Sequence, residues 1–150
     1  MKKQKYTRTP EQEQRFDAFQ VLARELMGEV TQDEGGRSLK STASSGTKQL
    51  ATRARELPGL QRYSLYNQLL ILKQRPGAVE VHGFAGWRER GYRVKRGEKV
   101  IYIRAPRSRA DGEEGIAGFS TKRVFDQDQV EPIPEGEQEQ GKAAQADNED

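Results

Sequence analysis

The residues with the clearest chemical potential lie between Gly83 and Pro106, in the sequence GFAGWRERGYRVKRGEKVIYIRAP. This stretch holds seven Lys and Arg residues, which only Glu89 and Glu98 oppose, and it interleaves these cations with aromatic rings. Cations bind the phosphates of a nucleic acid, and flat rings stack on unpaired bases. The pattern therefore predicts a surface for an unpaired strand. The candidate contacts are Tyr63, Asn67, Trp87, Arg88, Arg93, Lys95, Arg96, Lys99, Tyr102, Arg104 and Arg107.

Three of these candidates have to be weighed against a purely structural role. Trp87 is the only tryptophan of the chain, and a large ring can equally fill the core of a small domain. Asn67 could bind a base edge, although a hydrogen bond from its helix to the following hairpin is favoured. Tyr102 lies on the strand face opposite to Ile101 and Ile103, which are predicted to be core, so its ring is predicted to stay open for stacking.

The turn from Lys95 to Glu98 has two compatible interpretations. Its backbone N–H groups could cradle a phosphate. Gly97 could also supply the positive φ that a tight turn requires. Lys95 and Arg96 place two cations beside it in either case.

The composition excludes several kinds of active site. The 150-residue chain has no cysteine, which excludes disulfides and thiolate metal sites, and His82 is its only histidine. A catalytic relay would have to run through His82, for which a structural role is favoured. Asp126 and Asp128 could bind magnesium, but solvated charge is the preferred interpretation of an acidic region. We therefore predict a protein that is not an enzyme and that uses no cofactor or metal.

Charge is distributed very unevenly along the chain. Residues 61–109 contain 12 Lys and Arg residues against three Glu, and residues 126–150 contain nine Asp and Glu residues against Lys142. A basic body with an acidic tail indicates a polyanion-binding surface with an intramolecular competitor, and a solvated surface with a solubility tail is the alternative. No apolar run approaches the ~20 residues of a membrane span, and the N-terminus lacks the apolar core of a signal peptide. A soluble, cytoplasmic protein is expected.

The first half of the chain predicts three helices. Apolar residues recur at helical spacing, and Pro-Gly pairs follow two of the segments. The helices are expected from a Thr9 cap to Val30, over 48–57 and over 64–74, with a mobile loop rich in Gly, Ser and Thr over 31–47.

The second half predicts short strands. A change from helical spacing to alternation begins near Val79. The expected elements are a strand over 79–81, a helical turn over 84–90, a hairpin of 92–95 with 99–105, a charged loop over 107–115 and a last strand over 119–126.

These elements predict an α+β fold, with N-terminal helices packed on a small antiparallel β-sheet. Residues 1–8 form a frayed basic N-terminus, and residues 9–130 form the folded domain. Residues 131–150 are Glu-, Gln-, Pro- and Gly-rich without an aromatic residue, so they predict a disordered acidic tail.

Four motifs follow one another in a distinctive order within the predicted domain. They are SLYNQLLILKQ with Asn67 and Gln74, GFAGW with Trp87, GYRVKRGEKVIYIRAP with its Val-Lys-x-Gly-Glu-Lys turn, and VFDQDQVE. In this order and spacing, about residues 10–131 resemble the N-terminal single-stranded-DNA-binding domain of the ArdC family of anti-restriction proteins. The same module occurs in plasmid primase-like and phage-borne multidomain proteins. The resemblance implies a compact α+β domain that binds single-stranded DNA with little sequence preference.

The resemblance implies no catalysis for this chain. Full-length proteins similar to ArdC continue into a zinc metallopeptidase-like domain that carries His-Glu-x-x-His, and that motif is absent here. We therefore expect single-stranded DNA binding that serves anti-restriction or DNA-transfer protection for a plasmid, phage or other mobile element. RNA is a rival ligand, since stacking and phosphate contacts do not detect the 2′-hydroxyl. The alternative function is a protein-interaction or inhibitor module whose acidic tail mimics DNA and engages a protein partner.

Overall fold

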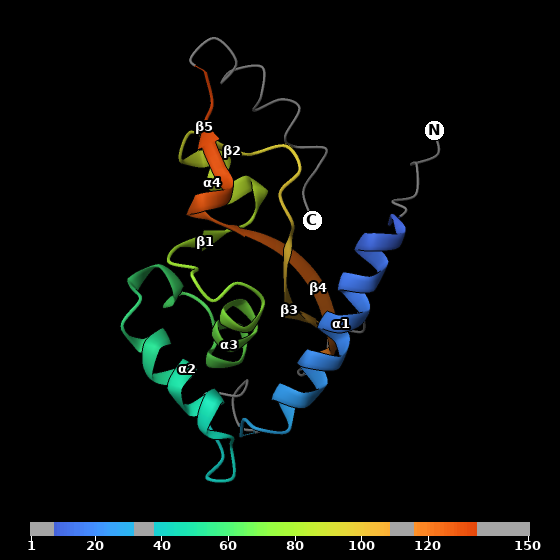
Figure 1. Cartoon of the computed structure of the whole chain (residues 1–150), viewed down its shortest axis with the longest axis vertical. Coiled ribbons are helices and arrows are strands. Elements are labelled where there is room, and N and C mark those ends of the chain that lie inside the picture. Colours follow the sequence, from blue (N-terminus) through green and yellow to red (C-terminus); the bar gives the residue numbers. More distant parts are fainter. Residues whose placement is uncertain (1–7, 32–37, 109–115, 135–150) are drawn as a thin grey trace.

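The computed structural model describes residues 8–31, 38–108 and 116–134, and it leaves the side chains of 106–108 and 116–119 undescribed. Within these ranges the fold is α+β, as predicted, with four α-helices and two small antiparallel sheets. Figure 1 shows α3 between α1 and α2, with α4 and the smaller sheet at the opposite end from α2. The helices are α1 (Pro10–Met27), α2 (Ser45–Arg55), α3 (Leu65–Gln74) and α4 (Phe84–Glu89), with 3-10 turns η1 (Pro58–Leu60) and η2 (Gln127–Gln129). The strands are β1 (Val81–His82), β2 (Tyr92–Val94), β3 (Ile101–Ser108), β4 (Ile116–Asp126) and β5 (Val130–Pro132).

Helix α1 begins at the predicted cap. The Thr9 hydroxyl accepts a hydrogen bond from the Gln12 backbone N–H at 3.2 Å, and the Gln12 side chain accepts one from the Thr9 backbone N–H at 2.8 Å. This reciprocal pair satisfies two backbone donors that a helix start otherwise leaves unpaired. Phe19, Ala23 and Leu26 are buried along one face, so the predicted apolar stripe is core.

The segment that leads into α2 is held more firmly than the sequence predicts. Leu39 forms a β-bridge with Val30, and Ser44 caps α2, which starts at Ser45 instead of at 48. The Glu29 carboxylate accepts hydrogen bonds from the Ser44 backbone N–H at 2.7 Å and from the Thr47 hydroxyl at 3.1 Å. The predicted loop is therefore too long by three residues, because 45–47 belong to α2, while 38–44 lie in a loop that these contacts hold; residues 32–37 lie outside the described ranges.

The predicted hairpin between 92–95 and 99–105 is wrong. The larger sheet has the order β1-β4-β3, and β2 pairs with β5 in a separate sheet. Gln129 explains the separation: its backbone oxygen accepts from the Lys95 N–H at 2.9 Å, and its side-chain amide donates to the Lys99 oxygen at 2.6 Å. These bonds anchor both ends of the turn to η2, so the chain leaves one sheet and enters the other.

Helix α3 covers the outer edge of β3. The Gln74 side-chain amide donates to the Tyr102 oxygen at 2.7 Å and accepts from the Tyr102 N–H at 2.9 Å. Asn67, about two turns earlier on α3, makes the same pair of bonds with the backbone of Arg104, at 2.7 Å and 3.1 Å. An edge strand normally exposes such unpaired groups. Here the two amides take the place of a neighbouring strand.

Both faces of β3 are buried over its first three residues, 101–103. Ile101 and Ile103 pack with α2, α3 and β4, as the sequence predicts, whereas Tyr102 packs with α1 and α3 on the other face. A third cluster joins Trp87 with Phe125 below the smaller sheet. None of the described helices has the length and apolarity needed to cross a membrane.

Two regular segments extend beyond their predicted ends. The tail was expected to begin at 131, but β5 continues to Pro132, and Ile133 is buried and donates its N–H to the Gly91 oxygen at 2.9 Å. The fold therefore includes residues 131–134, and 135–150 lie outside the described ranges. Similarly, β3 reaches Ser108, inside the predicted loop 107–115.

Candidate nucleic-acid interface

The most exposed group of predicted cations lies on the turn between β2 and β3. The Glu98 N–H donates to the Lys95 oxygen at 3.4 Å, and Gly97 has a φ of +83°, a backbone conformation that favours glycine. The prediction of a tight turn that needs Gly97 is therefore confirmed. Lys95, Arg96 and Lys99 are all exposed. We name Lys95–Lys99 the cationic turn.

The cations of this turn differ in their partners. The Lys95 ammonium donates to the Asp128 backbone oxygen at 3.1 Å. Lys99 lies 3.7 Å from the Glu11 carboxylate, and both side chains are more than 60% exposed (63% and 69%), so water screens this pair strongly. Arg96 contacts no partner among the residues that the structure describes. All three side chains can therefore reach a phosphate with little loss of existing interactions.

The cationic turn borders a cleft of about 420 Å³ between the start of α1 and the larger sheet. Phe84, Tyr102 and Phe125 contribute to its lining. Arg15 enters from α1 and donates to the Val100 oxygen at 3.0 Å. Further charged residues of the lining are Glu11, Glu98, Lys99 and Arg123.

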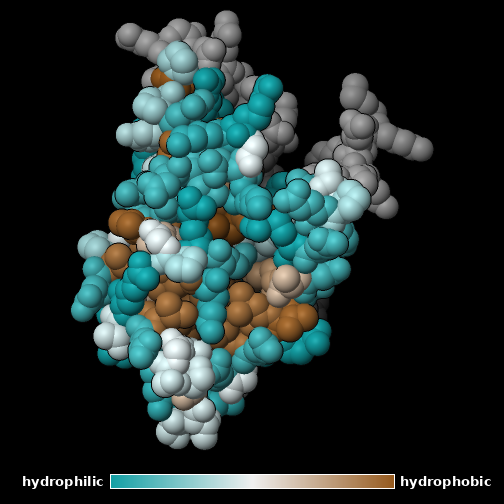
Figure 2. Space-filling view, viewed as in Figure 1, coloured by the Kyte–Doolittle hydropathy of each residue, from teal (hydrophilic) through white to brown (hydrophobic). Residues whose placement is uncertain are grey.

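The position of Arg123 follows from the register of the sheet. Arg123 pairs with Tyr102 across β4 and β3, and its guanidinium lies 5.9 Å from the centre of the Phe84 ring. The cleft thus combines cations from α1, β4 and the turn. Figure 2 shows mainly hydrophilic surface over the end that carries α4 and the smaller sheet, whereas apolar side chains gather around α3. The cleft is thus lined by both charged and aromatic residues.

The prediction that Tyr102 stays open for stacking is wrong. Only 3% of Tyr102 is exposed, and its ring centre lies 5.4 Å from that of Phe16 and 5.3 Å from that of Phe19. The cause is α1, which covers the face of β3 opposite to Ile101 and Ile103. Alternation along the strand separates the two faces correctly, but it does not reveal that both are covered.

Trp87 is also buried, so of its two interpretations the core role is the observed one. It is 4% exposed, and its indole N–H donates to the Phe125 backbone oxygen at 2.8 Å. The His82 ring contacts it edge-on at 4.8 Å. A base cannot stack on the face of Trp87 without unfolding this cluster.

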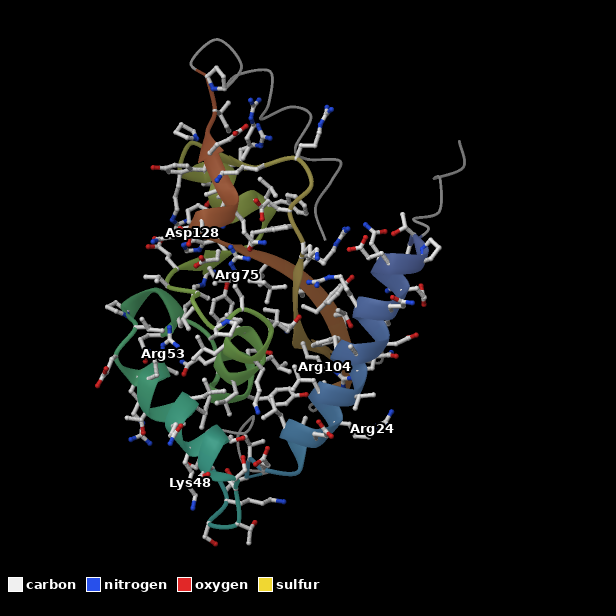
Figure 3. All side chains as sticks on the ribbon, in the orientation of Figure 1. Arg24, Lys48, Arg53, Arg75, Arg104 and Asp128 are labelled. Carbon is white, nitrogen blue, oxygen red and sulfur yellow. The ribbon has the colours of Figure 1, made fainter. Side chains whose placement is uncertain are left out.

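Asn67 makes the helix-to-strand hydrogen bonds that the sequence favoured. Its amide is engaged on both sides by the backbone of Arg104, so it cannot read a base edge. Arg104 itself is half-buried between α1 and α3, with its guanidinium 5.8 Å from the Phe19 ring centre. Figure 3 shows its place between the two helices. Asn67 is thus unavailable as a base contact, and Arg104 does not line the cleft beside the cationic turn.

The remaining candidates are distributed around the smaller sheet and η1. Arg93 on β2 forms an ion pair with Glu131 on β5 at 3.0 Å, and Arg88 is half-buried on the last turn of α4. Tyr63 donates its hydroxyl to the Val81 oxygen at 2.8 Å, and burial raises the pKa of this phenol. The backbone of Arg107 belongs to β3, but its side chain lies outside the described residues.

His82 and Asp126 have structural partners. Arg62 donates to His82 Nδ1 at 2.8 Å, and since Arg is only a donor, Nε2 carries the proton that meets Glu80 at 2.9 Å. Asp126 is fully buried and accepts from the backbone N–H groups of Val79 at 2.8 Å and Glu80 at 3.2 Å. Among the described residues, no group of three His, Asp or Glu side chains could hold a metal ion.

Sequence reasoning missed Arg15 and Arg123 as members of the site. Both lie outside the stretch from Gly83 to Pro106, and only the packing of α1 and the register of β4 bring them to one cleft. The register of β3 with β4 was the signal that could have found Arg123. For Arg15, the sequence carries no local signal.

Comparison of the chain with known protein families, with curated proteins and with solved structures finds no match.

Proposed function

We propose that this protein binds single-stranded DNA with little sequence preference, through the cationic turn and the adjoining cleft. The observation that carries the proposal is the convergence of Arg15, Lys99 and Arg123 on one cleft beside the exposed Lys95 and Arg96. Such a surface attracts the phosphate backbone irrespective of base sequence, because counterion release depends on charge alone. With Tyr102 and Trp87 in the core, phosphate contacts are the main source of affinity in this proposal.

The proposed biological setting comes from the motifs. The resemblance to the ArdC N-terminal domain supports a cytoplasmic, non-enzymatic role in which the protein protects DNA of a plasmid, phage or other mobile element. A single strand appears during transfer of such elements, and a binding protein without base preference can cover it. RNA is tested as a competing ligand, since the cations alone do not distinguish the two.

The decisive experiment is a titration of the full chain with a fluorescent oligothymidylate at two salt concentrations, followed by anisotropy. We expect binding that weakens steeply with salt. Lys95→Glu combined with Arg96→Glu should weaken it for all sequences and reduce the salt slope by about 1.4, at ~0.7 per lost contact to a single strand. Unlabelled RNA and duplex DNA of equal length serve as competitors.

The matched control reverses the same charges elsewhere. Lys48→Glu with Arg53→Glu changes the net charge equally, but both residues lie on α2, at the opposite end of the molecule from the smaller sheet. This variant should keep most of the affinity. Equal losses in the two double variants would show that only the total charge matters, and the proposed surface would then be wrong.

A further inference from the structure

A second cleft, of about 430 Å³, lies between α4, β2 and η2 and shares no residue with the first. This volume is within the ~300–1,000 Å³ range of small-molecule sites. It is large enough for one base. The lining residues are Glu80, Trp87, Arg90, Tyr92, Gln127, Asp128 and Val130.

Tyr92 gives this cleft an accessible ring. It is 37% exposed, more than any other aromatic residue whose side chain the structure describes. Its ring centre lies 5.7 Å from that of Trp87 at an interplanar angle of 75°, an edge contact that holds the ring in place. A base that enters the cleft therefore meets a positioned ring.

The polar groups of the cleft offer both donors and acceptors. Arg90 uses one guanidinium nitrogen for the Gly86 oxygen at 2.9 Å and retains other N–H donors. Asp128 is exposed at the start of the acidic region, and its carboxylate contacts no partner among the described residues. Figure 3 shows Asp128 between the part that carries the smaller sheet and the part that carries α2 and α3. The Glu80 carboxylate is already engaged by His82.

This combination favours a base over a phosphate. A carboxylate in the lining repels phosphate oxygens, but it accepts well from N–H groups. Guanine presents O6 and N7 as acceptors for a guanidinium, and its N1–H and amino group donate to a carboxylate. Adenine and cytosine lack the ring N–H beside an amino group, and thymine lacks the amino group.

We propose that this cleft binds a single unstacked guanine, with Tyr92 as the stacking ring, Arg90 as the donor to O6 and N7, and Asp128 as the acceptor from N1–H and the amino group. The inference rests on the proposed function, and it adds one base-selective position to a surface that is otherwise indifferent to sequence.

The test uses oligothymidylates of equal length with one central guanine, hypoxanthine, adenine or thymine. Guanine should bind about tenfold tighter than thymine, in the range of one good base contact, and hypoxanthine, which lacks the amino group, should fall between them. The Tyr92→Ala and Asp128→Asn variants should each reduce the guanine preference while plain oligothymidylate binding persists. Asp17→Asn, an exposed carboxylate on α1, is the matched control.

Trp87 provides an independent readout, because it is the only tryptophan of the chain and lines this cleft. Guanine-containing DNA should quench its fluorescence more than pure oligothymidylate. Equal affinity for all four oligonucleotides with equal quenching would overturn this inference and leave the proposed function intact. An absence of binding to any of them would instead contradict the proposed function. Quenching by a polyamine such as spermidine, without a guanine preference, would assign the cleft to a cationic ligand and also overturn the inference.

Discussion

Single side-chain amides hold this domain together at places where main-chain pairing stops. Asn67 and Gln74 pair with the edge of β3, and Gln129 joins η2 to the start of β3. The Asn67 and Gln74 amides each donate one hydrogen bond to the β3 backbone and accept one from it, and the Gln129 amide binds two separate segments. No apolar side chain can make these bonds. These amides belong to two of the motifs behind the family resemblance and serve the fold. The proposed phosphate contacts Lys95, Arg96 and Lys99 belong to a third motif and are exposed.

Asn67→Ala is the sharpest test of this role. The substitution leaves the N–H and oxygen of Arg104 without partners at a half-buried position, so we expect a loss of about 2–3 kcal/mol in the free energy of unfolding. Urea denaturation followed by circular dichroism measures it.

Gln49→Ala, at an exposed position of α2, is the control and should change stability by less than ~0.5 kcal/mol. The oligothymidylate affinity of the folded Asn67→Ala protein should stay close to wild type, because Asn67 is not a proposed contact. A selective loss of binding with unchanged stability would contradict this assignment and restore Asn67 to the interface.

At the scale of elements, one carboxylate links α1 to α2. The backbone N–H of Ser44, which donates to Glu29, is the largest cause that lowers the pKa of Glu29 below its ordinary value of 4.5. A depressed carboxyl pKa means that the folded state favours the charged form. The stabilisation is therefore present above the unfolded-state pKa and is lost as pH falls through the folded-state value.

Glu29→Gln should remove this pH-dependent contribution to the free energy of unfolding. At neutral pH we expect the variant to be less stable than wild type by about 1 kcal/mol, because the hydrogen bonds from Ser44 and Thr47 lose their charged acceptor. The difference should shrink below about pH 4.5, as the wild-type carboxyl is protonated. Thermal unfolding at several pH values measures it, with Glu25→Gln on the exposed face of α1 as control. A constant difference at all pH values would contradict the charge argument.

The elements differ in how far the sequence predicts them. The starts of α1 and α3 agree with the prediction of a Thr9 cap and of a helix from residue 64, because the caps Thr9 and Ser64 act on neighbours within one turn. The pairing of the strands does not follow from local signals, because it depends on the hydrogen bond of Gln129 to Lys99, which is distant in the sequence. The alternation of β3 likewise predicted two faces, but the covering of Tyr102 depends on where α1 packs. Local sequence signals therefore predict the helices and strands, whereas the exposure of the site residues depends on how these elements pack.

At the scale of the whole molecule, the charge is divided between the basic body and the end of the chain. Residues 135–150 carry six Asp and Glu residues against Lys142, a net charge of −5 in a chain of +3. Polyanion binding depends on this total as well as on the local surface. Truncation after Pro134 leaves a net charge of +8, as calculated from the sequence.

The position of the cut decides the result. Truncation after Pro134 retains β5 and should leave the unfolding midpoint unchanged. The truncated protein should bind oligothymidylate more tightly than the full chain at low salt, and this difference in affinity should become smaller at high salt. Truncation after Gln129 removes Val130 and Ile133, which are 8% and 5% exposed, and should cost at least about 2 kcal/mol of stability. Differential scanning calorimetry and anisotropy on both proteins separate the two effects. Weaker DNA binding after the first truncation, with stability unchanged, would place the acidic segment among the groups that support binding and contradict its role as a competitor.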